Sequence, residues 1–366
     1  MNRSFSVYLD LVRFTAACLV YLYHSNQRWL VADILPMSNY GHSAVIVFFV
    51  LSGFVIAYVT DTKERDWVSY SASRLSRVFS VVVPALALCV VLDAVGRQLT
   101  MEPYSYPFDR FGARIVGSLL MLNEIWLISI TSFSNVPYWS ITYEFWYYVL
   151  FALVTFLPGR QGLWLAGALL LLLGPKIALL APIWGAGVLL YRWRVLRTLS
   201  LGLSWALVVV STGAIIVLYG LGVFEAISNW FKGQVGADLT TQLTFSKFFV
   251  ADYLLTLLVF CNFAGMRQVA PSVAPVFQRL ERPVKWLAGY TFTLYLLHQP
   301  LFLFWGAVFR GDPRTHGPWL AVTAATGASI LVVGYFTENK RHHLKRAIER
   351  VLSSIERARL ARASCA

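Results

Sequence analysis

The sequence predicts an all-α, polytopic integral membrane protein with about ten transmembrane helices and both termini in the cytoplasm. Three observations predict this class. Hydrophobic residues make up 58% of the 366 residues and charged residues only 13%, whereas a soluble domain is about a quarter charged. Many apolar runs approach the length of about 20 residues that a helix needs to cross a bilayer. Lys and Arg gather in short loops between these runs, which is how membrane orientation is encoded.

The predicted spans follow the apolar runs, and the charges between them give the orientation. The ten runs are residues 6–25, 42–60, 78–95, 138–157, 162–175, 178–191, 199–223, 248–265, 286–309 and 318–337. With the N-terminus in the cytoplasm, 21 of the 31 Lys and Arg residues fall on the cytoplasmic side and nine on the other, with Arg13 inside a span. This asymmetry favours cytoplasmic N- and C-termini. The apolar stretch 112–130 is interpreted as amphipathic or re-entrant, because Asn123 and Glu124 interrupt it.

Composition and motifs also exclude several classes. The net charge of +13 does not indicate nucleic-acid binding, because the positive residues lie in loops between spans. No Gly-rich phosphate loop, HExxH or GxSxG motif is present. No pair of cysteines has metal-ligand spacing, so neither zinc nor a disulfide is expected. The four cysteines are Cys18, Cys89, Cys261 and Cys365.

The first span carries polar residues that an ordinary membrane anchor lacks. Asp10, Arg13 and His24 lie in DLVRFTAACLVYLYH. Arg13 and His24 are eleven residues apart, which places them on one helix face, about 16 Å apart along the axis. An intramembrane arginine costs at least a few kcal/mol, so it normally faces a polar interior or a ligand. The pattern indicates either a functional face or a structural Asp10–Arg13 pair with an interfacial histidine.

Glu144 and His298 place titratable groups in two further spans. Glu144 lies near the outer end of the fourth span, and His298 lies well into the ninth. Both are expected in the outer half of the membrane, at the depth of His24. Histidines and a carboxylate in a dry site are suited to general acid–base catalysis. Inter-helix hydrogen bonding or a proton relay in a transporter would use the same residues, and the residues alone do not separate these alternatives.

Two more patterns lie on either side of the loop that follows the second span. Arg74 and Arg77, in SRLSRVF, would face one way on a helix. Two arginines on one face suit a phosphate site, since each guanidinium can fork onto anionic oxygens, although ordinary positive-inside charge gives the same pattern. Ser52 belongs to the SGF of the second span, where small residues let helices approach closely.

These segments occur in a specific order. Along the chain they are DLVRFTAACLVYLYH, GHSAVIVFFVLSGFVIAY, SRLSRVF, YWSITYEFWYY and YLLHQP. Each is weak alone, but together they resemble the successive motifs of acyltransferase family 3, a family of membrane acyltransferases. One departure is Ser80, where the family often has proline; here the nearest proline is Pro84.

The resemblance implies an enzyme that transfers an acyl group, expected to be acetyl, from cytoplasmic acetyl-CoA or another acyl-CoA to a hydroxyl of a surface polysaccharide or lipid-linked glycan. It implies His24 as general base or transient acyl carrier, with Arg13, Glu144 and His298 as further catalytic residues. Arg74, Arg77 and Ser52 are implied to bind the donor, and no metal is needed. The protein would be a multi-pass protein of the bacterial inner membrane, with a homo-oligomer left open.

The resemblance also divides the chain and leaves competing hypotheses. Residues 1–338 would form the membrane-embedded acyltransferase domain, and residues 339–366 a basic cytoplasmic tail that meets anionic lipid headgroups. A transporter or flippase for a lipid-linked sugar or anionic metabolite is the alternative function. A transporter has no special need for a cytoplasmic arginine pair beside an intramembrane histidine, and no repeated halves are found. A scaffold protein would leave the costly intramembrane charges unexplained.

Overall fold

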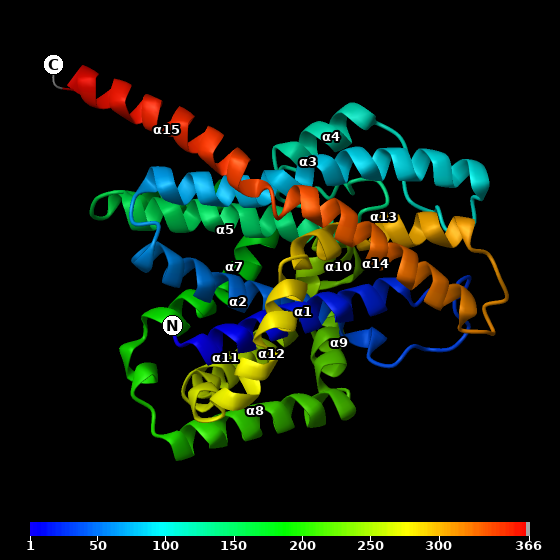
Figure 1. Cartoon of the computed structure of the whole chain (residues 1–366), viewed down its shortest axis with the longest axis horizontal. Coiled ribbons are helices and arrows are strands. Elements are labelled where there is room, and N and C mark those ends of the chain that lie inside the picture. The colour runs from blue at the N-terminus through cyan, green and yellow to red at the C-terminus, as the bar shows by residue number, and fades with distance from the viewer. Residues whose placement is uncertain (364–366) are drawn as a thin grey trace.

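The computed structural model describes residues 1–363, and over this range it is built from helices without a strand (Figure 1). Residues 364–366, Cys365 among them, lie outside the described part of the chain. The α-helices are α1 Arg3–Ser25, α2 Gly41–Thr62, α3 Trp67–Leu99, α4 Phe111–Leu119, α5 Tyr138–Phe156, α6 Gln161–Leu173, α7 Pro175–Arg192, α8 Leu201–Gly220, α9 Val223–Val235, α10 Ala237–Gln242, α11 Phe249–Ser272, α12 Ala274–Ala288, α13 Thr291–Val308, α14 Gly317–Thr337 and α15 Arg341–Ala363. Three short 3-10 helices join them: η1 Ser38–Tyr40, η2 Arg194–Arg197 and η3 Thr244–Phe248.

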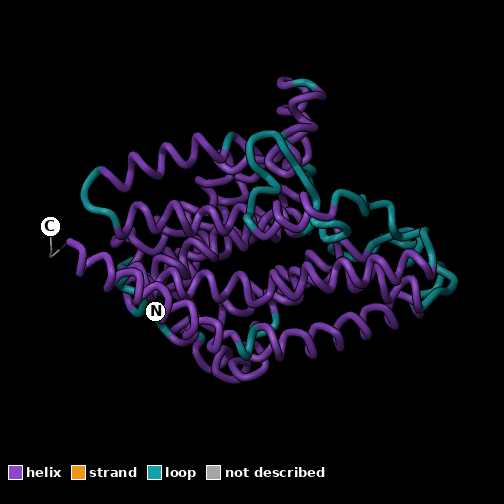
Figure 2. Tube along the Cα trace, turned by 90° about the horizontal axis from the view of Figure 1, so that it is seen from above, coloured by secondary structure: helices purple, strands orange, loops and turns teal. Residues whose placement is uncertain are grey.

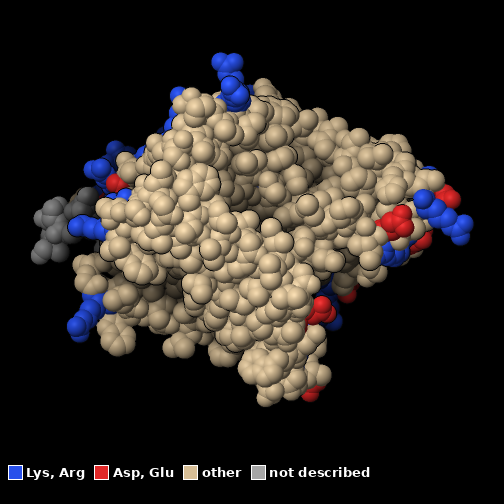
Figure 3. Space-filling view, turned by 90° about the horizontal axis from the view of Figure 1, so that it is seen from below, with Lys and Arg blue, Asp and Glu red and all other residues tan. Residues whose placement is uncertain are grey.

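The helices and the surface charges are arranged along the long axis of the molecule. Many of the helices run roughly along the long axis, and many of the loops collect at its ends (Figure 2). Both termini lie toward the same end (Figure 1). On the face drawn in Figure 3, most charged side chains lie toward the two ends, with a broad surface free of them between. Large apolar side chains are exposed on peripheral helices, as at Val210 of α8 and Phe336 of α14. This distribution suits a protein surrounded by lipid.

Within the described residues, six segments are long and apolar enough to cross a membrane: Arg3–Ser25, Ser38–Thr62, Trp67–Leu99, Leu201–Gly220, Thr244–Ser272 and Gly317–Ala358. The prediction of an all-helical protein with several membrane-crossing helices is therefore confirmed. The remaining predicted spans coincide with α5, α6, α7 and α13, which are shorter or more polar. Aromatic and polar residues of α5 and α13 line the cavities described below.

Helix α3 begins eleven residues before the predicted third span. Asp66 caps it, because its side chain accepts a hydrogen bond from the Ser69 backbone N–H at 2.8 Å. The helix then runs for 33 residues, about 50 Å, which exceeds the thickness of the bilayer core. It continues through Pro84. Arg74 and Arg77 therefore lie on the helix itself, one turn apart, as their spacing predicted.

Helices α1 and α2 form the centre of the molecule. α1 packs against α2, α11, α12 and α13, while α2 packs along α7. The α2–α7 contact depends on two glycines: a Cβ at Gly53 would lie 2.0 Å from the Trp184 carbonyl oxygen, and one at Gly187 would lie 2.0 Å from the Val50 carbonyl oxygen. The prediction that the small residues of SGF permit close helix packing is confirmed.

The apolar stretch 112–130 does not form one spanning helix. It consists of the nine-residue helix α4 followed by turns, and nine helical residues extend only about 14 Å. Glu124 is buried and pairs with Lys176 at the start of α7, with 2.5 Å between carboxylate and ammonium. Ser129 donates to Glu124, and Lys176 donates to the Ile128 carbonyl. Glu124, one of the two residues that interrupted the apolar run, thus anchors an irregular segment against α7.

The described residues of the basic tail are helical from Arg341 onward and pack on the domain. α15 lies along α3, and the Trp67 indole donates to Glu356 at 2.8 Å. Arg341, its first residue, lines a cavity together with residues of α1 and α3. The boundary predicted at residue 339 falls in the turn before α15.

Candidate functional site

Five of the seven predicted site residues line one cavity, the arginine cavity. They are Arg13, Ser52, Arg74, Arg77 and Glu144. Five helices supply its walls: α1, α2, α3, α5 and α13. The cavity is narrow, about 70 Å³. Residues spread over about 130 positions of the sequence are therefore brought together by helix packing.

Arg13 and its partner lie at one side of this cavity. Its Nη1 is 3.2 Å from Oδ1 of Asp10, three residues earlier on α1. The predicted Asp10–Arg13 pair is confirmed. Because the pair is an i,i+3 contact on one helix, and Arg13 also lines the cavity, the guanidinium keeps donors free for another partner.

Glu144 is held by two hydroxyl groups. Ser52 donates to its Oε1 at 2.5 Å and Tyr148, one turn later on α5, donates to the same atom at 2.6 Å. The Trp184 indole N–H in turn donates to Ser52 Oγ at 3.2 Å. Such a network fixes the rotamer of each member, so Ser52 and Glu144 act as one polar unit in the cavity wall.

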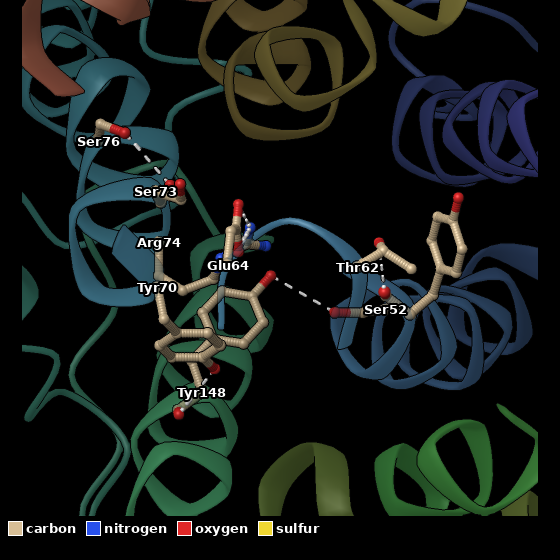
Figure 4. A network of polar contacts seen from close by, with 9 residues as sticks. Ser52, Thr62, Glu64, Tyr70, Ser73, Arg74, Ser76 and Tyr148 are labelled. Atoms are coloured by element: carbon tan, nitrogen blue, oxygen red, sulfur yellow. Dashed lines mark hydrogen bonds and ion pairs between the residues drawn. The ribbon is translucent and has the colours of Figure 1, made fainter. Parts of the chain in front are cut away.

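Arg74 and Arg77 lie on the same helix but in different surroundings. Arg74 forms a salt bridge with Glu64, in which its Nη2 donates to both carboxylate oxygens, at 2.9 and 2.8 Å. The Arg74 guanidinium also lies near the rings of Tyr70 and Tyr148 (Figure 4). Arg77 lies 5.8 Å from the Phe292 ring centroid. Within residues 1–363, the Arg77 guanidinium has no ion pair. Arg77 is therefore the more available of the two for an anionic ligand.

A second space, the basic vestibule, opens beside the arginine cavity. The two share Arg13, Arg77, Thr291 and Phe292 in their walls. The vestibule adds Lys285 and Arg341, with Asp10 and Glu338 as its acidic residues. Arg341 was missed by the sequence analysis, since it lies in a run of basic residues where no local signal separates it from its neighbours.

His24 lines a much larger space, the histidine cavity, of about 730 Å³. Its walls come from α1, α2 and α11 and from the segments around α9 and η3. Val45 and Tyr295 line both this cavity and the arginine cavity. The basic vestibule, arginine cavity and histidine cavity therefore adjoin one another in that order.

His24 and His298 lie side by side, with ring centroids 5.1 Å apart. The His298 Nδ1 is 2.8 Å from the Tyr295 carbonyl and 3.0 Å from the Leu294 carbonyl. Since a carbonyl only accepts, Nδ1 carries the hydrogen and the lone pair of the neutral ring is at Nε2. That Nε2 is buried and has no hydrogen-bond partner within the described residues.

The predicted cluster of His24, Glu144 and His298 does not form one site. The two histidines are together, but Glu144 lines the arginine cavity and His24 the histidine cavity. Tyr295 lies between them: it lines both cavities, and its hydroxyl is 2.6 Å from Ser140 Oγ. Glu144 is therefore grouped with Arg13 and Ser52, which differs from the expected grouping. The reason is that depth along a helix does not specify the direction in which a side chain points.

A second pair in the histidine cavity was also missed. His42 Nε2 lies 3.0 Å from each carboxylate oxygen of Asp252. His42 follows Gly41 at the start of α2 and Asp252 lies in the first turn of α11. Their 210-residue separation left no local pattern to find. Within residues 1–363, no group of three or more His, Cys, Asp or Glu residues could hold a metal ion.

Comparisons with known proteins identify the family. A family described as an acyltransferase domain, acyltransferase family 3, matches residues 6–338. The chain belongs to acyltransferase family 3. Acyltransferase MdmB of Streptomyces mycarofaciens is 29% identical over 170 residues, and this match covers 43% of the chain and 42% of that relative. No solved structure matches with significance.

Family 3 membership confirms the predicted family and the predicted enzyme class, an acyltransferase. The match with MdmB spans less than half of that relative's length, so it adds nothing on substrates. An acyltransferase requires an acyl donor and an acceptor, and the apolar helices indicate a multi-pass membrane protein.

Proposed function

We propose that this family 3 protein is a membrane O-acyltransferase that moves an acetyl group from cytoplasmic acetyl-CoA to a hydroxyl of an extracytoplasmic or lipid-linked glycan. The observation that carries the proposal is the series of three adjoining spaces. The series begins at the cations of the basic vestibule, passes Arg13 and Glu144, and ends at His24. Acetyl-CoA has charged phosphates at one end and a long, thin pantetheine chain at the other. The phosphates would fit the basic vestibule, and the chain would fit the small arginine cavity beside it.

The donor side of the proposal rests on Arg13, Arg74 and Arg77. Guanidinium groups bind phosphate oxygens through two parallel hydrogen bonds. Arg77 faces both the vestibule and the arginine cavity, so it suits a phosphate at the entrance. Arg341 adds a fourth arginine to the same region. Ser52 and Glu144 line the narrow part, where they would contact the arm of the donor near its thioester.

The chemistry of the proposal centres on His24. As general base, His24 takes the proton of the acceptor hydroxyl while the oxygen attacks the thioester carbonyl; the C–S bond then breaks and the thiolate of CoA takes a proton. As a transient carrier, His24 would accept the acyl group first and pass it to the hydroxyl afterwards. His298 offers its Nε2 lone pair beside the His24 ring, which suits it to hold the orientation and proton of His24.

The membrane arrangement is part of the proposal. We infer about ten spans, with both termini in the cytoplasm, in the inner membrane of a bacterium. The positive-inside asymmetry of the loops and the position of both termini at one end (Figure 1) support it. Residues 1–338 would form the catalytic domain. Residues 339–366 would form a cytoplasmic segment whose first residues contribute to the vestibule.

Acyl transfer by purified protein in nanodiscs tests the proposal. Wild type is incubated with labelled acetyl-CoA and a crude envelope glycan extract, alongside His24→Ala and the exposed-loop control His316→Ala. We expect wild type and the control to move label into glycan, and His24→Ala to lose about 10²- to 10⁴-fold in rate, the usual contribution of a general base.

The opposite result has a defined meaning. If folded wild type neither binds nor consumes acetyl-CoA, the transferase proposal fails for that donor. A transporter or flippase would then be tested by flux assays, because a series of adjoining cavities would also suit transport.

A further inference from the structure

We infer that His42 and Asp252 form a second ligand site in the histidine cavity, one that binds a hydroxyl of a neutral, polyhydroxylated ring such as a sugar. This inference deepens the proposed function and rests on it, because it names the part of the acceptor that enters the cavity. The pair lies in the same cavity as His24.

The geometry fixes which ring nitrogen of His42 is available. Both carboxylate oxygens of Asp252 are 3.0 Å from His42 Nε2. An ionised carboxylate only accepts hydrogen bonds, so Nε2 carries the hydrogen and the lone pair of the neutral ring is at Nδ1. The Asp252 side chain is 5% exposed and that of His42 is 24% exposed. A buried carboxylate thus orients a partly open imidazole toward the cavity, an arrangement suited to accepting a hydrogen bond from a hydroxyl.

The walls around His42 are aromatic. The Phe248 ring centroid is 4.8 Å from that of His42, and the Trp139 ring lies nearly parallel to His42 at 6.4 Å. Trp139 in turn stacks on Phe245 at 4.4 Å. Flat apolar surfaces beside a fixed hydrogen-bond acceptor match a sugar ring, which has C–H-rich faces and hydroxyls at its edge.

The charges of the cavity do not favour an anion. Lys232 and Lys247 line it, but so do Glu225 and Asp252. The two ammonium groups also lie 5.0 and 5.3 Å from the centroid of the Phe248 ring, which engages part of their charge. A balanced set of charges together with a neutral acceptor atom selects a neutral polyol over a phosphate or carboxylate.

Saturation-transfer NMR on the protein in nanodiscs tests the site, with a mixture of methyl hexopyranosides as probes and 1-butanol as the monohydric comparison. We expect saturation transfer to hexosides but not to butanol. His42→Gln should weaken hexoside binding about three- to tenfold, the loss of one hydrogen bond, and His316→Gln, a matched histidine in an exposed loop, should not change it.

Two variants of Asp252 provide a second test of the site. Asp252→Asn keeps an acceptor for Nε2–H and should bind hexosides within twofold of wild type, whereas Asp252→Ala should weaken binding two- to fivefold. Acetyl-CoA binding is measured in the same samples. Unchanged hexoside affinity in His42→Gln, or no hexoside binding by wild type, would overturn the inference.

Two further outcomes separate the inference from the proposed function. If His42→Gln and Asp252→Ala lose acetyl-CoA affinity in parallel with hexoside affinity, the pair has a structural role and the inference is overturned. If wild type binds hexosides through His42 but never consumes acetyl-CoA, the hydroxyl site stands while the proposed transfer fails. The two failures are therefore distinguishable.

Discussion

The arginine cavity and the histidine cavity are built on different principles. The arginine cavity is narrow, about 70 Å³, and its polar residues come from helix interiors and hold one another through short hydrogen bonds. The histidine cavity is about tenfold larger, about 730 Å³, and part of its wall comes from the segments around α9 and η3. Under the proposed function, the small cavity would hold the acyl donor in one geometry. The larger cavity, whose wall comes partly from connecting segments, would admit the acceptor.

Breaking the buried Glu124–Lys176 pair should give the largest effect on the stability of the protein. Lys176→Met removes the ammonium and leaves a carboxylate buried at 2% exposure. Breaking a buried pair costs about 3–5 kcal/mol, so we expect that loss in the free energy of unfolding, measured in mixed micelles. Lys176→Met with Glu124→Gln should recover part of it. Equal losses in both variants would show that the segment 120–137 is not held by this pair.

Arg77→Ala tests whether the arginine cavity binds the acyl donor. Hydrogen bonds to charged groups contribute about 1.5–3 kcal/mol, so KM for acetyl-CoA should rise about ten- to a hundredfold with a smaller change in kcat. Arg74→Ala is the matched comparison, and it should raise KM less because Arg74 already pairs with Glu64. A larger effect of Arg74→Ala would reverse the assignment of the available guanidinium.

Tyr148→Phe removes one of the two hydroxyls that hold Glu144. A typical intramolecular hydrogen bond contributes about 0.5–1.5 kcal/mol, and Ser52 still donates to Glu144 in this variant. Transfer should therefore slow about two- to twelvefold, with hexoside binding in the histidine cavity unchanged. Tyr143→Phe, whose hydroxyl lies near Ser246 instead, is the control. Equal changes in hexoside binding and transfer would mean that the two cavities are not separable.

Glu281 gives the smallest effect and lies outside the candidate membrane-spanning segments. The hydrogen bond from Arg3, followed by that from Lys285, lowers the pKa of Glu281 to about 2. A lowered pKa stabilises the folded state above the ordinary carboxyl pKa of about 4.3, and this contribution is lost as the pH falls toward 2. Glu281→Gln should therefore lower Tm slightly at pH 7 and by a smaller amount at pH 3. A Tm difference that does not shrink on acidification would contradict this linkage.

Much of the arrangement was predictable from local sequence. The all-helical class follows from the apolar runs, and close helix packing at Gly53 from the small residues of SGF. The shared helix face of Arg74 and Arg77 follows from their spacing. The start of α3 was not, because Asp66 extends the helix beyond the apolar run. The grouping of Glu144 with Ser52 instead of His24 was not either, because it depends on how α5 is rotated against α2.

The sequence by itself determined the residue types and their order: an arginine and a histidine on the first helix, an arginine pair, a glutamate and a second histidine. These are local features, encoded by spacing on single helices. The tertiary structure alone decided that Arg13, Ser52 and Glu144 share one narrow cavity and that His42 meets Asp252. Contacts between residues far apart in sequence depend on the rotation and packing of whole helices, and no local pattern specifies these.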